Sequence, residues 1–173
     1  MANKAIDNLL TRKSLRFFSS RKVKEEKIDQ ILECGLKAPS GRNLQTANFL
    51  VIQDPKTISK LKRLSDKEMN RVVFYNAKTL ILVYANKNSS GLYVQDCSCA
   101  LDNLFLAANA LKIGSCWINQ FEELLSTKAG LKVREELGLT TDDVVVGTCA
   151  LGYPSKDATY REIVPNPNRV RKI

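Results

Sequence analysis

The segment from Leu92 to Leu111 constrains the fold more than any other part of this sequence. Its apolar residues fall at the spacing of an α-helix, and its second half, from Leu104 to Ala108, is apolar on almost every side. A helix of this kind must be buried on most of its faces. In a chain of 173 residues we therefore expect a central helix, or one that is shared with a second copy of the chain.

Helices and short strands alternate in the rest of the pattern. Helical spacing runs from Lys24 to Leu36, through Ile58 to Leu64, and from Glu122 to Leu137, where Gly138 provides a stop. Short β-rich runs occupy residues 48–52, 79–84 and 144–151, and the last of these is expected to be the final strand, while residues 114–118 are a strand or an extended loop. The pattern predicts one α+β domain over residues 1–173, with an extended arm from about residue 155.

The composition is that of an ordinary cytoplasmic protein. Apolar residues make up 44% and charged residues 26% of the chain, and no run approaches the ~20 apolar residues of a membrane span. The first residues lack the pattern of a secretory signal. Five scattered cysteines, an odd number, are typical of free thiols in a reducing compartment. We expect a cytoplasmic location and no membrane partner.

The chain contains no histidine. This excludes Ser/His and Cys/His nucleophilic sites and removes the usual general base near neutral pH. The only close cysteine pair, Cys97 and Cys99, is a poor metal site without a second pair or a histidine. We therefore expect no metal, and if the protein is an enzyme, something other than histidine carries its chemistry.

A net charge of +9 favours anionic partners. The basic residues are spread along the chain, apart from a modest cluster at Arg169, Arg171 and Lys172, and no nucleic-acid motif accompanies them. The charge is therefore better explained by a phosphorylated small molecule than by nucleic acid.

Arg12, Ser14 and Arg16 are spaced so that two guanidinium groups and a hydroxyl share one face of an extended segment or of a helical turn. The planar fork of arginine matches phosphate oxygens, so this triplet is a candidate phosphate clamp. On these residues alone, a solvated basic helix end is the preferred interpretation.

Four motifs in order make the chain resemble the FMN-dependent nitroreductase family from about Asn8 to Arg161. They are Arg12 to Arg16, Ala38 to Gln45, the helix and turn from Asp102 to Ile118, and Ala150 to Pro154. Each motif alone is weak, but their order and separation are specific. The resemblance implies a nitroreductase-like fold, in which helices flank a central mixed, mostly antiparallel β-sheet, and a homodimer with a buried central helix.

The resemblance also implies an FMN site. Arg12 and Ser14 would hold the phosphate end, while Arg16 would lie near flavin N1 and the C2 carbonyl, where a cation stabilises the charge of the reduced ring. Pro39, Ser40 and Asn43 would reach the cofactor from the neighbouring subunit. Asn70 would lie at the pyrimidine edge of the ring, and the backbone of Asn119 and Gln120 would lie near N5 or O4. Arg161 would return to the phosphate, with Arg169 and Arg171 as alternative candidates.

The implied function is an FMN-dependent NAD(P)H oxidoreductase that passes electrons through flavin N5 to a small acceptor such as a nitroaromatic or a quinone, with ping-pong kinetics. An alternative is a flavin-binding or redox-sensing protein of the same fold without efficient turnover. Two departures from the family pattern stand out: Thr46-Ala47 replaces a frequent Pro-Trp pair, and Asn109 replaces a common histidine. The first bears on the shape of the substrate pocket.

Overall fold

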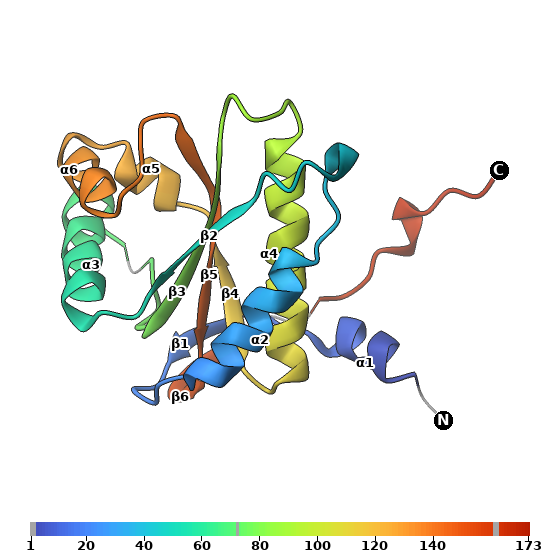
Figure 1. Ribbon diagram of the computed structural model, residues 1–173. Coiled ribbons are helices and arrows are strands. Elements are labelled where there is room, and N and C mark those ends of the chain that lie inside the picture. Colours follow the sequence, from blue (N-terminus) through green and yellow to red (C-terminus); the bar gives the residue numbers. More distant parts are fainter. Residues whose placement is uncertain (1–2, 72, 161–162) are drawn as a thin grey trace.

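The computed structural model describes residues 3–71, 73–160 and 163–173 (Figure 1). Its elements, in chain order, are α1 (Lys4–Thr11), β1 (Leu15–Phe18), α2 (Glu25–Leu36), the short 3₁₀ helix η1 (Gly41–Asn43), β2 (Asn48–Ile52), α3 (Pro55–Met69), β3 (Thr79–Asn86), α4 (Tyr93–Ala110), β4 (Gly114–Ile118), α5 (Phe121–Leu125), α6 (Lys128–Glu136), β5 (Asp143–Gly152), β6 (Pro154–Tyr160) and η2 (Pro167–Arg169).

Four strands form the main sheet, in the order β2-β3-β5-β4, and every neighbouring pair is antiparallel. A second, two-stranded sheet pairs β1 with β6, also antiparallel. One isolated parallel bridge, between Ser14 and Ser115, connects the segment before β1 to β4. The predicted α+β architecture with a mostly antiparallel sheet is confirmed.

Helices cover both faces of the main sheet (Figure 1). α3, α5 and α6 lie on one face over a core that includes Leu61, Leu80 and Phe121, and α2 and α4 lie on the other over a core that includes Ile31 and Leu101. β3 is buried along nearly its whole length because both layers cover it.

The expected central helix is α4. Its inward residues are buried against the sheet and α2, but Leu106 and Ala107 are only half-buried. A single chain therefore covers α4 on most sides and leaves part of its apolar second half uncovered.

The prediction of one helix from Glu122 to Leu137 is wrong in one respect, because this segment forms two helices. α5 ends at Leu125, and Thr127 then begins α6 by accepting a hydrogen bond from the Gly130 backbone N–H at 3.0 Å. Gly130 packs so closely that an added Cβ would lie 2.0 Å from the Leu124 carbonyl oxygen. The cap and the tight contact together separate the two helices.

Residues 144–151, predicted to be the final strand, are followed by one more. Residues 154–160 form β6, with Leu15 opposite Tyr160 and Arg16 opposite Thr159. The polar sequence of this segment resembles a tail, and its pairing with β1 makes it a strand. In the parts of the chain that the structure describes, no helix is both long enough and apolar enough to cross a membrane.

Candidate functional site

Arg12, Ser14 and Arg16 are brought together beside the first residues of β4. α1 ends at Thr11, and Arg12 takes an extended conformation (φ −60°, ψ 129°). Ser14 then bridges Ser115, and Arg16 lies in β1. All three predicted residues are half-buried, and their segment is extended, although Arg12 is also the residue that caps the end of α1.

The buried thiol of Cys116 in β4 lies close enough to this cluster for its pKa to be affected by the two arginines. Burial raises the pKa of Cys116, while the positive charges of Arg16 and then Arg12 act in the opposite direction. Both guanidinium groups therefore lie within electrostatic reach of the same atom. The cluster concentrates two cations in a partly desolvated place, where an anion is bound more strongly than at an open surface.

An aromatic pair lies next to Arg16. Its guanidinium carbon is 5.9 Å from the centre of the Tyr75 ring, and Phe17 contacts the same ring edge-on with centroids 5.7 Å apart. The Phe18 backbone N–H donates to the Tyr75 carbonyl at 2.8 Å. Tyr75 therefore supports both the backbone and the charged side chain of β1.

Asn119 and Gln120 lie at the opposite end of β4. Asn119 is exposed directly after the strand, and Gln120 precedes the first turn of α5. With the rise of a β-strand, Ser115 and Asn119 are about 13 Å apart. The arginine cluster and the predicted backbone donors thus mark the two ends of one strand.

Asn70 has a structural explanation of its own. It ends α3 in the left-handed conformation (φ 48°, ψ 41°) and is exposed. Asparagine tolerates this conformation better than most residues, so the helix end accounts for it. Its predicted contact with a ligand stays a prediction.

The structure does not bring Pro39, Ser40 and Asn43 to the arginine cluster of the same chain. Their loop is held at the first turn of α4, where the Gly41 N–H donates to Asp96 at 2.8 Å. The region of Arg12 lies at the other end of α4, where Asn109 donates to the Asn8 carbonyl at 3.0 Å. Asn109 lies thirteen positions after Asp96 in this helix, which corresponds to a length of about 20 Å.

Arg161 lies outside the described residues. Of the reserve candidates, Arg169 ends η2 and Arg171 follows it, and both are exposed on a segment that extends away from the sheets (Figure 1). Neither contacts the cluster within the described parts of the chain, so which arginine returns to the phosphate stays a prediction.

Sequence reasoning missed Tyr75, Thr46 and Asp96. Asp96 is 4% exposed and accepts hydrogen bonds from Gly41 and from the Thr46 hydroxyl, the latter at 2.7 Å. The available signal was an acidic residue in the first turn of a helix whose neighbouring positions are largely apolar. Tyr75 carried no signal, because its role depends on contacts with a strand almost sixty residues earlier.

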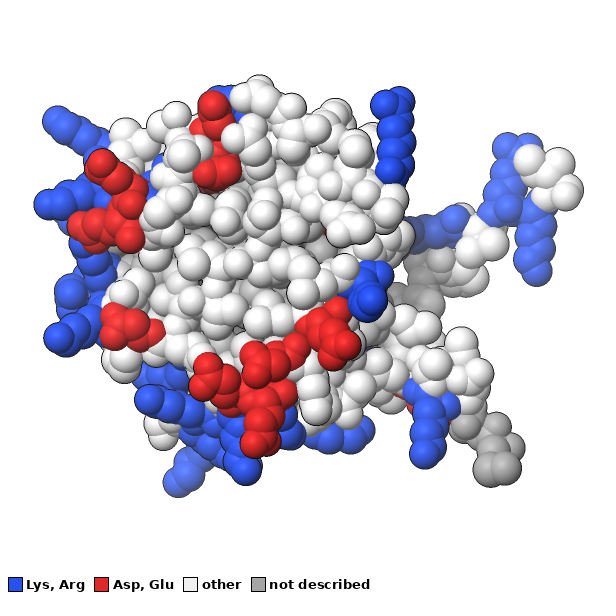
Figure 2. Space-filling model, viewed as in Figure 1, with Lys and Arg blue, Asp and Glu red and all other residues white. Residues whose placement is uncertain are grey.

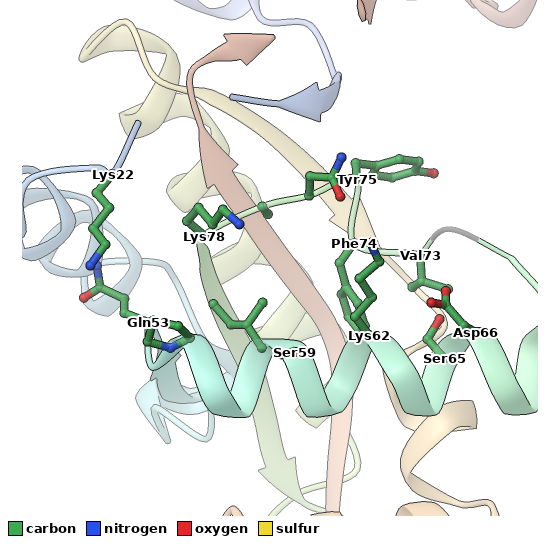
Figure 3. Close-up of a pocket in the computed structure, with 14 residues that line it drawn as sticks. Lys22, Gln53, Ser59, Lys62, Ser65, Asp66, Val73, Phe74, Tyr75 and Lys78 are labelled. Atoms are coloured by element: carbon green, nitrogen blue, oxygen red, sulfur yellow. The ribbon is translucent and has the colours of Figure 1, made fainter. Parts of the chain in front are cut away.

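A separate cavity of about 190 Å³ lies between α3 and residues 73–78 (Figure 3). Three lysines from different segments, Lys22, Lys62 and Lys78, surround it, and Ile58 and Phe74 contribute apolar walls. Of the predicted cofactor residues that the structure describes, none lines this cavity. Tyr75 is its one link to the arginine cluster, because the same residue lines the cavity and packs against Arg16.

Basic residues do not gather into one strip on the face shown in Figure 2. Lys and Arg lie mostly around its margin, uncharged residues fill the centre, and an acidic group lies below the centre. This face therefore carries no continuous basic groove for a polyanion.

Fold and cluster together define an α+β protein with a compact cationic site at the junction of its two sheets. The model of the nitroreductase family matches residues 9–73 and 59–153. An Archaeoglobus fulgidus protein named provisionally as an NADH dehydrogenase/NAD(P)H nitroreductase is 34% identical over 170 residues, which cover 95% of this chain and 94% of that protein. The chain belongs to the nitroreductase family, as its motifs predicted.

Solved structures agree with this assignment. A Bacteroides fragilis nitroreductase with bound FMN superposes with a TM-score of 0.89 at 26% identity, over 99% of this chain and 100% of that one. Human iodotyrosine deiodinase 1 is a more distant relative, 24% identical over 186 residues that cover 90% of this chain and 63% of that protein. The expectations of a nitroreductase fold and of an oxidoreductase are thus confirmed.

Proposed function

We propose that this protein is an FMN-dependent NAD(P)H oxidoreductase that reduces nitroaromatics, quinones or similar small acceptors. The observation that carries the proposal is the convergence of Arg12, Ser14 and Arg16 beside β4, in a family whose solved members include FMN-bound nitroreductases. The names of the relatives support NAD(P)H as the electron donor.

The residues present fit FMN. The Arg12 guanidinium and the Ser14 hydroxyl supply a charged and a neutral donor for the phosphate, and their partial burial protects those bonds from water. Asn119 and Gln120, at the far end of β4, offer backbone N–H groups at a distance that suits an elongated ligand. Arg16 adds a positive charge for the ring, so the donor set suits a phosphorylated ring system.

FMN, when bound, supplies the hydride and electron transfer chemistry. The residues of the chain bind and orient the cofactor and stabilise the charge of its reduced ring. Arg12 and Ser14 fix the phosphate end, and Arg16 provides a positive charge that Tyr75 and Phe17 hold in place. A fixed cation beside the ring favours its reduction, because negative charge collects on the nearer edge. No proton-transferring side chain is needed, which agrees with a chain without histidine.

We also propose that the working form is a homodimer. α1 has no buried residue, and its Leu10 side chain is 77% exposed. Leu36, Leu44, Leu92 and Val94 add exposed apolar surface near the loop that carries Ser40 and Asn43. Because that loop is about 20 Å of helix away from its own chain's Arg12, a second copy supplies the loop to each cofactor site.

An absorbance spectrum before and after addition of NADH or NADPH, without oxygen, tests the proposal. We expect a flavin spectrum that one of the two donors bleaches and a nitroaromatic or quinone restores. A colourless protein that gains no spectrum with added FMN would contradict the proposal. A yellow protein that neither donor bleaches would favour the flavin-binding or redox-sensing alternative.

Gel filtration tests the dimer separately. We expect the mass of two chains with bound flavin, and a monomer that retains flavin would contradict the cross-subunit site. We propose a cytoplasmic location for this activity, because its donor is a cytoplasmic metabolite and the five cysteines are free thiols.

A further inference from the structure

The carboxylate of Asp96 is buried in the first turn of α4, and both hydrogen bonds that it accepts come from the same loop. One oxygen accepts from the Gly41 backbone N–H at 2.8 Å and the other from the Thr46 hydroxyl at 2.7 Å. Its position near the amino end of a helix also favours a negative charge. A buried carboxylate is retained only where such donors satisfy it, so Asp96 and the loop depend on each other.

The loop between Ala38 and Thr46 needs this support. Three of its residues, Arg42, Asn43 and Gln45, have positive φ angles of 53°, 56° and 50°. Such angles are unfavourable for residues other than glycine and persist only where surrounding contacts enforce them. Within the loop, the Gln45 N–H donates to the Ser40 hydroxyl oxygen at 2.9 Å, which sets the position of Ser40 but does not attach the loop to the rest of the protein.

Gly41 allows the attachment. A Cβ added there would lie 2.5 Å from Cδ1 of Leu92, just before α4. The backbone of the loop can therefore approach the helix closely enough for the Gly41 N–H to reach Asp96. Thr46 provides the second attachment, so the two bonds enclose Asn43, while Ser40 lies directly before the first attachment point, Gly41.

We propose that Asp96 is a positioning residue for the cofactor site: its buried carboxylate fixes the loop in the conformation that presents Ser40 and Asn43 to the FMN of a second copy of the chain. This inference rests on the proposed function, because it takes FMN and the dimer from there. It adds a residue that touches no cofactor and acts across the subunit boundary.

The first test follows the loop itself, in flavin-free protein. Asp96→Asn leaves one acceptor where two are needed, and Thr46→Val removes one donor with little change of shape. We expect hydrogen exchange of the Gly41 amide to accelerate at least tenfold in Asp96→Asn. In Thr46→Val we expect a smaller increase. Asp66→Asn, which changes an exposed carboxylate on the opposite face of the sheet, is the control and should leave the exchange rate of the Gly41 amide unchanged. Unaltered Gly41 exchange in Asp96→Asn would overturn the proposal.

The second test measures FMN affinity by fluorescence titration. A misplaced loop loses contacts with the ring, so we expect the Kd to rise about tenfold in Asp96→Asn and severalfold in Thr46→Val. Thr46→Val keeps the carboxylate and its bond to Gly41, so it should fold even if Asp96→Asn does not. Wild-type Kd values in both variants would overturn the proposal, whereas a wild-type chain that binds no FMN would instead overturn the proposed function.

The third test asks which subunit's site Asp96 serves. A heterodimer of one Asp96→Asn and one Arg12→Ala subunit, isolated with two affinity tags, has one site with an intact clamp and an intact loop, and one with both defects. We expect one FMN per dimer at wild-type affinity, although each homodimer binds weakly. If Asp96 served its own subunit's site, neither site would recover, and that result would refute its action across the boundary.

Discussion

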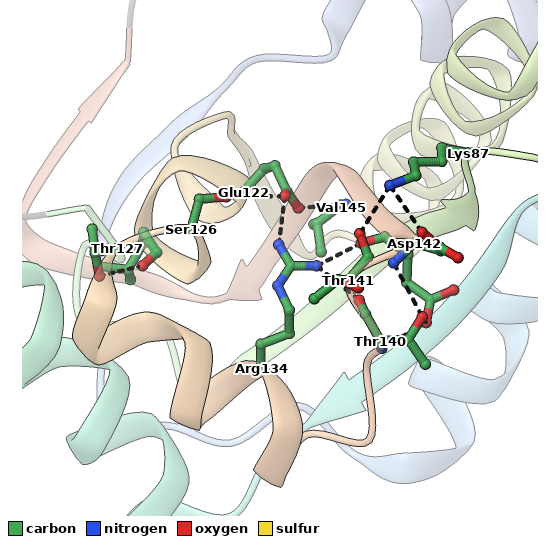
Figure 4. Close-up of polar contacts among 11 residues, drawn as sticks. Lys87, Glu122, Ser126, Thr127, Arg134, Thr140, Thr141, Asp142 and Val145 are labelled. Carbon is green, nitrogen blue, oxygen red and sulfur yellow. Dashed lines mark hydrogen bonds and ion pairs between the residues drawn. The ribbon is translucent and has the colours of Figure 1, made fainter.

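Arg134 and Glu122 form an ion pair that joins both halves of the divided helix to the main sheet (Figure 4). Arg134 lies in α6 and Glu122 in α5. The second carboxylate oxygen of Glu122 accepts from the Val145 backbone N–H of β5 at 2.8 Å, and Arg134 also donates to the Thr140 carbonyl at 3.2 Å. The pair thereby satisfies backbone groups at the start of the strand that lies between β3 and β4.

Replacing Arg134 with methionine should destabilise the fold. The Arg134 side chain is 5% exposed, and its loss leaves the Glu122 carboxylate and the Thr140 carbonyl without their partner. We expect a loss of about 3 kcal/mol, at the low end for a broken buried pair because Glu122 is 32% exposed. Urea denaturation measures it. Lys60→Gln, which breaks an exposed pair with Glu136, should leave the midpoint almost unchanged.

Replacing Arg12 with alanine should weaken FMN binding by about 1.5–3 kcal/mol, the value of a charged hydrogen bond. The neighbouring exposed Lys13 provides a matched control, because Lys13→Ala removes the same charge from the same segment without changing the clamp. Titration of flavin fluorescence distinguishes the two. Equal Kd values for both variants would show that the effect is one of net charge, not of a specific contact.

Replacing Thr148 with valine should stabilise the protein. This residue of β5 is 0% exposed, and its hydroxyl has no hydrogen-bond partner in the described residues. Valine has the same shape without the unsatisfied group, so we expect a gain of about 1 kcal/mol. Thermal denaturation checks it, with Thr79→Val as the comparison because that buried hydroxyl accepts from Gln53 at 3.5 Å. A lower melting temperature for Thr148→Val would point to an internal water on that hydroxyl.

Stability should fall as the pH rises above 9. Burial raises the pKa of Cys97 to about 12, with a further contribution from the charge of Asp96, whereas the unfolded thiol keeps its ordinary value of 9.0. The folded state therefore holds a proton that the unfolded state loses between these values, and each pH unit above 9 costs about 1.4 kcal/mol. Urea midpoints at pH 8 and pH 10 measure the change, and Cys97→Ala should show a smaller loss than the wild type.

Local periodicity was sufficient to predict β2, β3 and α4, because each is an apolar run with a clear spacing, whereas it left β4 open between a strand and an extended loop. It could not divide the helix at Thr127, where a cap and a glycine decide the outcome through contacts that only the fold creates. It also could not predict β6, whose polar residues become a strand only beside β1.

The candidate site shows the same limit. The cluster of Arg12, Ser14 and Arg16 could be predicted, because its residues are close together in the sequence. The bonds that Asp96 makes to Gly41 and Thr46 span 55 and 50 residues. No spacing pattern in the sequence predicts contacts between residues so far apart in the chain.

The pairing of β1 with β6 has a consequence for the order of events during synthesis. Arg16 lies opposite Thr159, so the strand that carries it has no ladder partner until the ribosome has released the segment from Pro154 to Tyr160. Arg16 is therefore paired in a strand only after almost all of the described chain is present, because Thr159 lies 143 residues later in the sequence.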